Sequence, residues 1–255
     1  MNIHMKEKIL TAIQLSKLAY DPLPKIMAKL NIAGYTDVKA FNGLESDVQG
    51  FFCTDKVKAW VVIRGTEIDS LRDWKRNFNA GFHQSHWGEV HKGFYFGAIV
   101  GINYILPELN KAIEEGKEII FTGHSQGAAI ALQMFACNEY KRNKLCKCIP
   151  VEAPRSFSKA AAKKFGAWWG RHIYPVINNN DIVTNVPTRF MGYAHVERTY
   201  VQYIDRKGNV RQGITWKNKF FDRLLGMLSH LGKPGLDVLE DHNIGTIERV
   251  WKEQM

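Results

Sequence analysis

The residues with the most specific chemical meaning in this chain form one pentapeptide, Gly123-His124-Ser125-Gln126-Gly127. It follows a short β-rich run at 117–122 and precedes residues 128–140, which are Ala-rich, free of Gly and Pro, and typical of a helix. A serine on such a sharp strand-to-helix turn has crowded neighbours, and the two glycines leave space for close backbone approach. The N–H groups that begin the helix favour negative charge beside the Ser125 hydroxyl. The pentapeptide therefore predicts a serine nucleophile for acyl transfer.

The elements expected around this turn include both helices and strands. Apolar spacing predicts a helix over 5–18 that ends before Pro22 and Pro24, and a second helix over 95–115. Short apolar runs predict strands over 51–56, 57–63, 149–152 and 172–177, and a hairpin over 200–214. The run 57–63 is almost continuously apolar, which places it inside a sheet.

The composition is that of a globular protein. The 255 residues are 45% hydrophobic and 24% charged, and no Pro-, Gly- or Ser-rich linker divides them, so we expect one domain over 1–255. No apolar run approaches the roughly 18 to 20 residues that span a bilayer, and the N-terminus lacks the apolar core of a signal peptide. These features predict a cytoplasmic protein or export by a non-classical route.

The formal net charge is +10, which predicts attraction to an anionic surface such as lipid headgroups. A run of five or more basic residues and a nucleic-acid motif are both absent, which argues against a nucleic-acid partner. Reduced thiols are expected, because Cys146 and Cys148 would face the same side of a strand, a poor arrangement for a disulfide. A metal site is not expected, because this pair lacks an adjacent histidine partner. The four cysteines are Cys53, Cys137, Cys146 and Cys148.

Six short motifs, in their order along residues 50 to 250, resemble those of the class 3 lipases, a branch of the α/β-hydrolases that includes fungal triacylglycerol lipases. They are Arg64-Gly65-Thr66, His91-Lys92-Gly93-Phe94, the pentapeptide around Ser125, Ala153-Pro154-Arg155, Asn180-Asp181-Ile182-Val183 with Pro187, and Asp241-His242. The resemblance implies an α/β-hydrolase fold: a central, mostly parallel sheet flanked by helices, with a short lid-like segment at about 67–80. It also implies a serine ester hydrolase that needs no metal or organic cofactor.

The resemblance assigns the catalytic residues as Ser125, Asp181 and His242. In α/β-hydrolases the acid and then the histidine follow the serine along the chain, so His172, which precedes Asp181, is excluded. His195 lies in a family segment without a catalytic role, and His230 lies in an amphipathic helix. The resemblance further assigns the oxyanion hole to Thr66 and to the backbone N–H of Gln126.

Two segments keep alternative readings. Residues 67–78 form an amphipathic pattern, either a lid over the acyl groove or a fixed surface helix. Residues 216–231, with Lys217 and Lys219, form a basic amphipathic helix for an anionic membrane or for core packing. The candidates for substrate contact are Ile68, Leu71, Trp74 and His124, although His124 more readily packs below the nucleophile.

The expected function is hydrolysis of lipid carboxylic esters, either triacylglycerol or an anionic phospholipid cut as by a phospholipase A. A short-chain or aryl carboxylesterase is one alternative, and a catalytically idle module that binds anionic membrane is another. Gln126 stands where the family usually has Leu, and Ala128 where it often has Gly. These departures concern the shape of the acyl pocket and not the reaction, because the donor at Gln126 is a backbone N–H.

Overall fold

The computed structural model describes residues 2–43, 48–65, 81–137, 145–179, 181–212 and 241–255. Several sequence-based expectations therefore lie outside the described residues. These are the lid-like segment at about 67–80 with Thr66, Ile68, Leu71 and Trp74, and the basic helix at 216–231 with Lys217, Lys219 and His230.

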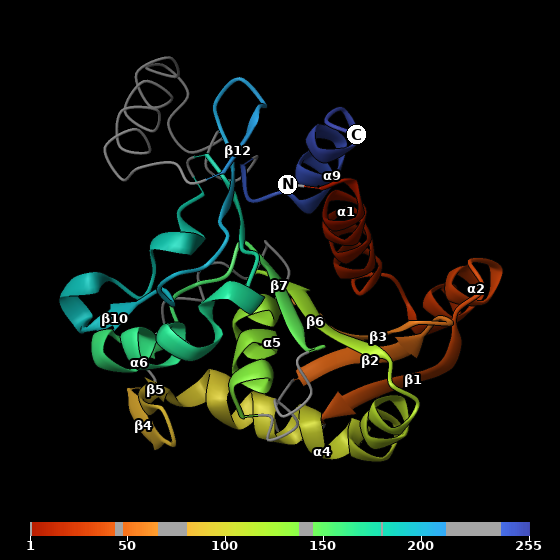
Figure 1. Ribbon diagram of the computed structural model, residues 1–255, viewed down its shortest axis with the longest axis horizontal. Helices are drawn as coiled ribbons and strands as arrows, with labels where there is room; N and C mark the ends of the chain where they lie inside the picture. Colours follow the sequence, from red (N-terminus) through yellow and green to blue (C-terminus); the bar gives the residue numbers. More distant parts are fainter. Residues whose placement is uncertain (1, 44–47, 66–80, 138–144, 180, 213–240) are drawn as a thin grey trace.

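A sheet of eight strands forms the centre of the described structure, in the order β1-β2-β3-β6-β7-β9-β11-β12 (Figure 1). Its strands are β1 (Thr36–Gly43), β2 (Val48–Thr54), β3 (Lys58–Ile63), β6 (Glu118–His124), β7 (Lys147–Val151), β9 (Val176–Asn178), β11 (Gln202–Ile204) and β12 (Val210–Gln212). The strands from β3 to β11 run parallel to one another, while β1, β2 and β12 pair antiparallel at the two edges. Parallel strands bring their carboxyl ends to one edge of the sheet, where the candidate side chains follow.

Helices cover both faces of this sheet (Figure 1). The cluster of buried side chains on one face includes residues of α1 (Ile3–Leu18), α2 (Leu23–Ile32) and α9 (Ile244–Lys252). The cluster on the other face includes residues of α4 (Lys92–Glu114), α5 (Gln126–Cys137) and α6 (Lys159–Trp169). Strand β3 alternates between them, with Trp60 and Val62 in the first and Val61 and Ile63 in the second. This two-sided burial explains the nearly continuous apolar run at 57–63.

Two features were not anticipated from the sequence. A second sheet has the order β10-β8-β5-β4, from Tyr193–Ala194, Phe157–Ser158, Gly88–His91 and Phe82–Ser85. The helix α2 begins directly at the prolines that were expected only to end α1: Pro22 is its N-cap and Pro24 lies in its first turn. A proline is tolerated there because the first N–H groups of a helix have no partner within the helix.

The four cysteines carry thiols, and Cys146 and Cys148 both join the buried cluster on the α4 and α5 side of the sheet. Burial raises the pKa of the Cys148 thiol well above its usual range, so this thiol stays protonated at neutral pH. Within the described residues, we find no helix with the length and apolar character needed to cross a membrane.

Candidate active site

Ser125 stands at the turn between β6 and α5 with a backbone φ of 59°, in the left-handed region that non-glycine residues rarely adopt. The two glycines of the pentapeptide make this turn possible. A Cβ at Gly127 would lie 2.4 Å from the carbonyl oxygen of Ile63, and one at Gly123 would lie 2.6 Å from the same oxygen. Only glycine fits at both positions, because the obstructing atoms belong to the backbone.

The Ser125 side chain is completely buried, and its Oγ has no hydrogen-bond partner among the described residues. Its backbone N–H donates to the carbonyl of Val151 over 2.9 Å, which ties the turn to β7. Gln126 is the first residue of α5, so its N–H belongs to the positive end of that helix. A Cβ on Gly65 would lie 3.3 Å from the Cβ of Ser125, so the chain passes close to the serine just before it reaches Thr66.

Asp181 follows β9 and is completely buried. Its Oδ1 accepts a hydrogen bond of 2.8 Å from the backbone N–H of Val183, which fixes the orientation of the carboxylate. Its Oδ2 lies 3.1 Å from the Nδ1 of His242. The two residues that the sequence paired are therefore in contact, although 60 residues separate them along the chain, from position 181 to position 242.

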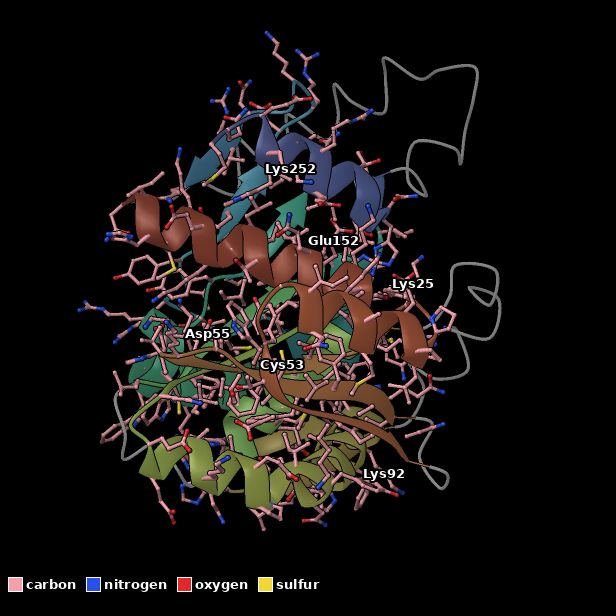
Figure 2. All side chains as sticks on the ribbon, turned by 90° about the vertical axis from the view of Figure 1, so that its right-hand side faces the viewer. Lys25, Cys53, Asp55, Lys92, Glu152 and Lys252 are labelled. Carbon is pink, nitrogen blue, oxygen red and sulfur yellow. The ribbon has the colours of Figure 1, made fainter. Side chains whose placement is uncertain are left out.

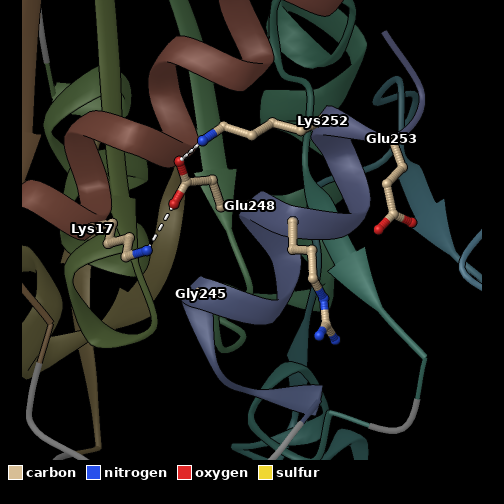
Figure 3. Close-up of a pocket in the computed structure, with 6 residues that line it drawn as sticks. Lys17, Gly245, Glu248, Lys252 and Glu253 are labelled. Atoms are coloured by element: carbon tan, nitrogen blue, oxygen red, sulfur yellow. Dashed lines mark hydrogen bonds and ion pairs between the residues drawn. The ribbon is translucent and has the colours of Figure 1, made fainter.

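His242 comes two residues before α9 and is held by the packing of that helix on α1. Glu248 of α9 lies between Lys17 of α1 and Lys252, with carboxylate-to-amine distances of 2.8 and 2.6 Å (Figure 3). Helix α1 is anchored in turn to the nucleophile strand, because the hydroxyls of Ser16 and Thr122 lie 3.1 Å apart. These contacts place the segment that carries His242 beside the end of β6.

His124 connects the nucleophile turn to His242. The ring centroids of the two histidines lie 4.5 Å apart, and His124 Nε2 donates to the carbonyl oxygen of His242 over 3.0 Å. The other ring nitrogen, Nδ1, then accepts from the Tyr20 hydroxyl over 2.8 Å. Burial, and secondarily the charge of His242, hold the pKa of His124 well below its usual range. Protein groups thus occupy both ring nitrogens of this candidate for substrate contact.

Glu152 is the residue of this site that the sequence did not reveal. It was expected only as the end of a strand, but its side chain is completely buried and lies inside the fold (Figure 2). Its Oε2 is 2.9 Å from His242 Nδ1, closer than the carboxylate of Asp181. One signal could have identified it: a charged residue directly follows an apolar strand that neighbours the nucleophile strand.

The two carboxyl groups dominate the electrostatics of His242. Burial is the largest single effect and disfavours the imidazolium, but Asp181 and Glu152 together outweigh it and raise the pKa of His242. For Glu152, burial first and the charge of Asp181 second raise the pKa well above its usual range, against the opposing pull of His242. The three side chains therefore share their protons as one cluster.

The remaining described histidines lie in other surroundings. His172 Nδ1 is 3.3 Å from the carbonyl oxygen of Cys146, and His195 Nε2 donates to the carbonyl of Thr184 over 2.7 Å. His91 accepts a hydrogen bond from the backbone N–H of Phe94 and caps α4. Among the described residues, His242 is the histidine that contacts Asp181.

Three ligand-type atoms, from His124, Glu152 and His242, lie within 4.8 Å of one another and could in principle hold a cation. The hydrogen bonds of these side chains argue against a cation site. His124 Nε2 faces a carbonyl oxygen and must carry a proton, so it offers no lone pair to a metal. The donor set therefore fits a proton-sharing cluster better than a metal centre.

A serine on a strand-to-helix turn of a mainly parallel sheet, with an acid and then a histidine following it along the chain, defines a serine hydrolase with the α/β-hydrolase fold. The sequence model of the class 3 lipases matches residues 60–191. The chain therefore belongs to the class 3 lipase family and is a lipase-type ester hydrolase, which confirms the family, fold and enzyme class expected from the sequence.

Solved structures of fungal lipases share this fold. The triacylglyceride lipase of Rhizomucor miehei superposes with a TM-score of 0.73 at 18% identity, over 96% of this chain and 98% of that one. The Lip2 lipase of Yarrowia lipolytica gives a TM-score of 0.69 at 19% identity, over 80% of this chain and 82% of that one. A further triacylglycerol lipase, described as having a serine protease triad at its catalytic centre, gives a TM-score of 0.67 at 18% identity, over 83% of this chain and 85% of that one.

Proposed function

We propose that this protein hydrolyses carboxylic esters of lipids through an acyl-enzyme on Ser125, with His242 as the general base and Asp181 as the carboxylate that orients it. The observation that carries this proposal is the contact of 3.1 Å between His242 Nδ1 and Asp181 Oδ2. Ser125 stands in a left-handed turn directly after His124, whose ring contacts the backbone of His242. A carboxylate on Nδ1 keeps the proton on that nitrogen and leaves Nε2 to act as the base.

The proposed reaction has two steps. Ser125 Oγ attacks the ester carbonyl while His242 Nε2 takes its proton, and the same proton then passes to the departing alcohol, leaving an acyl-enzyme. Water, deprotonated by His242, attacks the acyl carbon and releases the carboxylic acid and free Ser125. The N–H groups of Gln126 and Thr66 would hold the oxyanion, each donor contributing about 3 kcal/mol to transition-state stabilisation.

Lipid esters are the proposed substrate class because the family and its structural neighbours are lipases, among them triacylglycerol lipases. The net charge of +10 favours substrates presented on anionic surfaces, which adds phospholipids to neutral glycerides. A panel of triacylglycerol, anionic phospholipid, and short-chain or aryl esters would identify the preferred ester.

Labelling by a fluorophosphonate probe, with ester turnover followed in the same samples, tests the proposal. We expect Ser125→Ala and His242→Ala to lose labelling, and kcat/KM to fall by a factor on the order of 10⁴ to 10⁶. His172→Ala is the matched control, since this histidine lies against Cys146, and should label as the wild type does. Unchanged labelling of Ser125→Ala would refute the assignment, and an unlabelled, inactive wild type would favour an idle binding module.

A further inference from the structure

Glu152 occupies a position equivalent to those of the nucleophile and the acid. Ser125, Glu152 and Asp181 follow β6, β7 and β9, which are consecutive neighbours in the sheet. The backbone N–H of Glu152 donates to the carbonyl of Val176 over 2.9 Å, just as that of Ser125 donates to Val151. The topology therefore brings two carboxyl groups, and not one, to the edge where His242 lies.

The two oxygens of Glu152 have different contacts in this position. Oε1 accepts a hydrogen bond of 2.9 Å from the backbone N–H of Asn178, which locks the side chain. Oε2 lies 2.9 Å from His242 Nδ1 and 3.9 Å from His124 Nε2. Asn178 also donates through its side chain to the carbonyl of Asp241 over 2.8 Å, so one residue fixes both Glu152 and the chain before His242.

Two features of Glu152 in this position are energetically unfavourable. Its φ of 55° lies in the left-handed region, which costs a non-glycine residue about 1 to 3 kcal/mol. Its carboxyl group is completely buried, and burial of an ionisable group is unfavourable unless a partner compensates for it. Strain of this kind concentrates at functional sites, so these costs point to a role in the chemistry.

We propose that Glu152 is a second positioning acid of the site, whose carboxyl group shares His242 Nδ1 with Asp181 and can orient the histidine when Asp181 is removed. This inference rests on the proposed function. The imidazole has a single N–H at Nδ1, which cannot point at both oxygens at once, so the two carboxyl groups compete for it. One of them can hold a proton while the other carries the negative charge.

The charged and titratable groups around Glu152 are consistent with one proton shared between the two carboxyl groups. Asp181 faces it from the loop after β9, His242 from the segment before α9, and His124 from β6, with Tyr20 behind His124. Burial and the charge of Asp181 raise the pKa of Glu152, and His242 opposes this shift, so the proton balance of the group depends on all three side chains. When Glu152 ionises, its charge adds to that of Asp181 and favours the imidazolium, which is inactive as a base.

The test measures two quantities in the intact protein: the pH dependence of ester kcat/KM, and the titration of the His242 ring nitrogens by NMR. In Glu152→Gln, which keeps the shape of the side chain, we expect the pKa of His242 and the acid limb of the rate profile to move down by about 1 pH unit or more. Glu118→Gln is the matched control, because that carboxylate pairs with Lys8 away from the site, and should leave both unchanged.

Removal of Asp181 tests whether Glu152 can take over. In a conventional triad, losing the acid lowers the activity about 10⁴-fold. Here we expect the single variant Asp181→Asn to keep at least about tenfold more activity than the double variant that also carries Glu152→Gln. Asp181→Ala repeats the comparison without an amide that could donate to Nδ1. Thermal melts identify any variant that fails to fold.

The two proposals fail in different ways. The role of Glu152 would be overturned by two results together in a protein whose wild type is active. The His242 titration and the acid limb would be unchanged in Glu152→Gln, and the Asp181 variants would be as inactive as the double variants. A wild type that neither labels nor hydrolyses esters would overturn the proposed function, while the NMR titration would still show whether Glu152 controls the pKa of His242.

Discussion

Backbone strain at this site is confined to single residues at the ends of neighbouring strands. Ser125, Glu152 and Asn179 have φ values of 59°, 55° and 22°, and they follow β6, β7 and β9. Each turn redirects the chain at the edge of the sheet so that functional side chains converge. The left-handed conformation at Ser125 needs glycine neighbours, because backbone atoms of Ile63 and Arg64 surround the turn.

Gly127→Ala tests this requirement. Its Cβ would lie 2.4 Å from the oxygen of Ile63 and 2.6 Å from that of Arg64, and neither backbone atom can move freely. We expect a loss of about 1 to 3 kcal/mol in the free energy of unfolding, a melting temperature lower by roughly 3 to 10 °C, and little fluorophosphonate labelling.

Gly34→Ala is the control, because Gly34 also has a positive φ, of 79°, but open space around it. It should cost only the conformational strain, about 1 to 2 kcal/mol, and keep full labelling. Equal labelling of the two variants would show that the turn accommodates a side chain and that our account of the glycines is wrong.

Among the elements, α9 has the clearest influence on the site, because it begins two residues after His242. Glu248 ties it to α1, and Trp251 donates its indole N–H to the carbonyl of Lys6 over 3.2 Å. Burial tends to raise the pKa of Glu248, but the hydrogen bonds and charges of Lys17 and Lys252 outweigh it and lower the pKa to about 2, from 4.5. This lowered pKa links the packing of α9 to pH.

Because the pKa of Glu248 is lower in the folded state, its contribution to stability is present above pH 4.5 and is lost as the pH falls toward about 2. Both lysines are about half exposed, so we expect Glu248→Gln to cost only about 1 kcal/mol at pH 7, or roughly 2 to 4 °C in melting temperature. Thermal melts of the wild type and the variant from pH 7 to pH 2.5 measure this difference, which should shrink as the pH falls.

Glu253→Gln provides the matched control on the same helix, since no ion pair of Glu253 is found within the part of the chain that the structure describes. It should melt as the wild type does at every pH. A Glu248 difference that stays constant down to pH 2.5 would contradict the ionic origin of this contact.

At the scale of the whole molecule, the charge of +10 is the property that bears on substrate delivery. Ester bonds of lipids lie at a surface, and long-range attraction concentrates a cationic protein at an anionic one. Salt screens this attraction, because the Debye length falls from about 10 Å at 0.1 M to about 3 Å at 1 M. Electrostatic adsorption is therefore separable from apolar adsorption.

We expect the protein to adsorb to vesicles that contain anionic phospholipid in preference to zwitterionic vesicles, and this preference to decline steadily between low salt and about 0.5 M. Sedimentation with vesicles of the two compositions measures it, using Ser125→Ala so that the lipid is not consumed. Equal adsorption to both compositions at low salt would show that the net charge has no part in surface binding.

The sequence by itself determined the parts of this protein that depend on local spacing. The strand, Ser125 and helix of the nucleophile turn are contiguous, so periodicity and glycine placement were sufficient to predict them. The strands expected over 149–152 and 172–177 exist with other bounds, Lys147–Val151 and Val176–Asn178. The order of motifs also identified the family and fold correctly. The roles of Ser125, Asp181 and His242 remain predictions that the geometry supports.

The tertiary structure alone decided which side chains meet. His124 contacts the carbonyl of His242 across 118 residues of sequence, and Glu152 approaches the same histidine although no spacing rule links them. Such contacts depend on strand order and on the packing of α9 against α1. Local sequence patterns do not encode either of these. A charged residue after a strand is usually solvated, and only burial at the sheet edge made Glu152 part of this site.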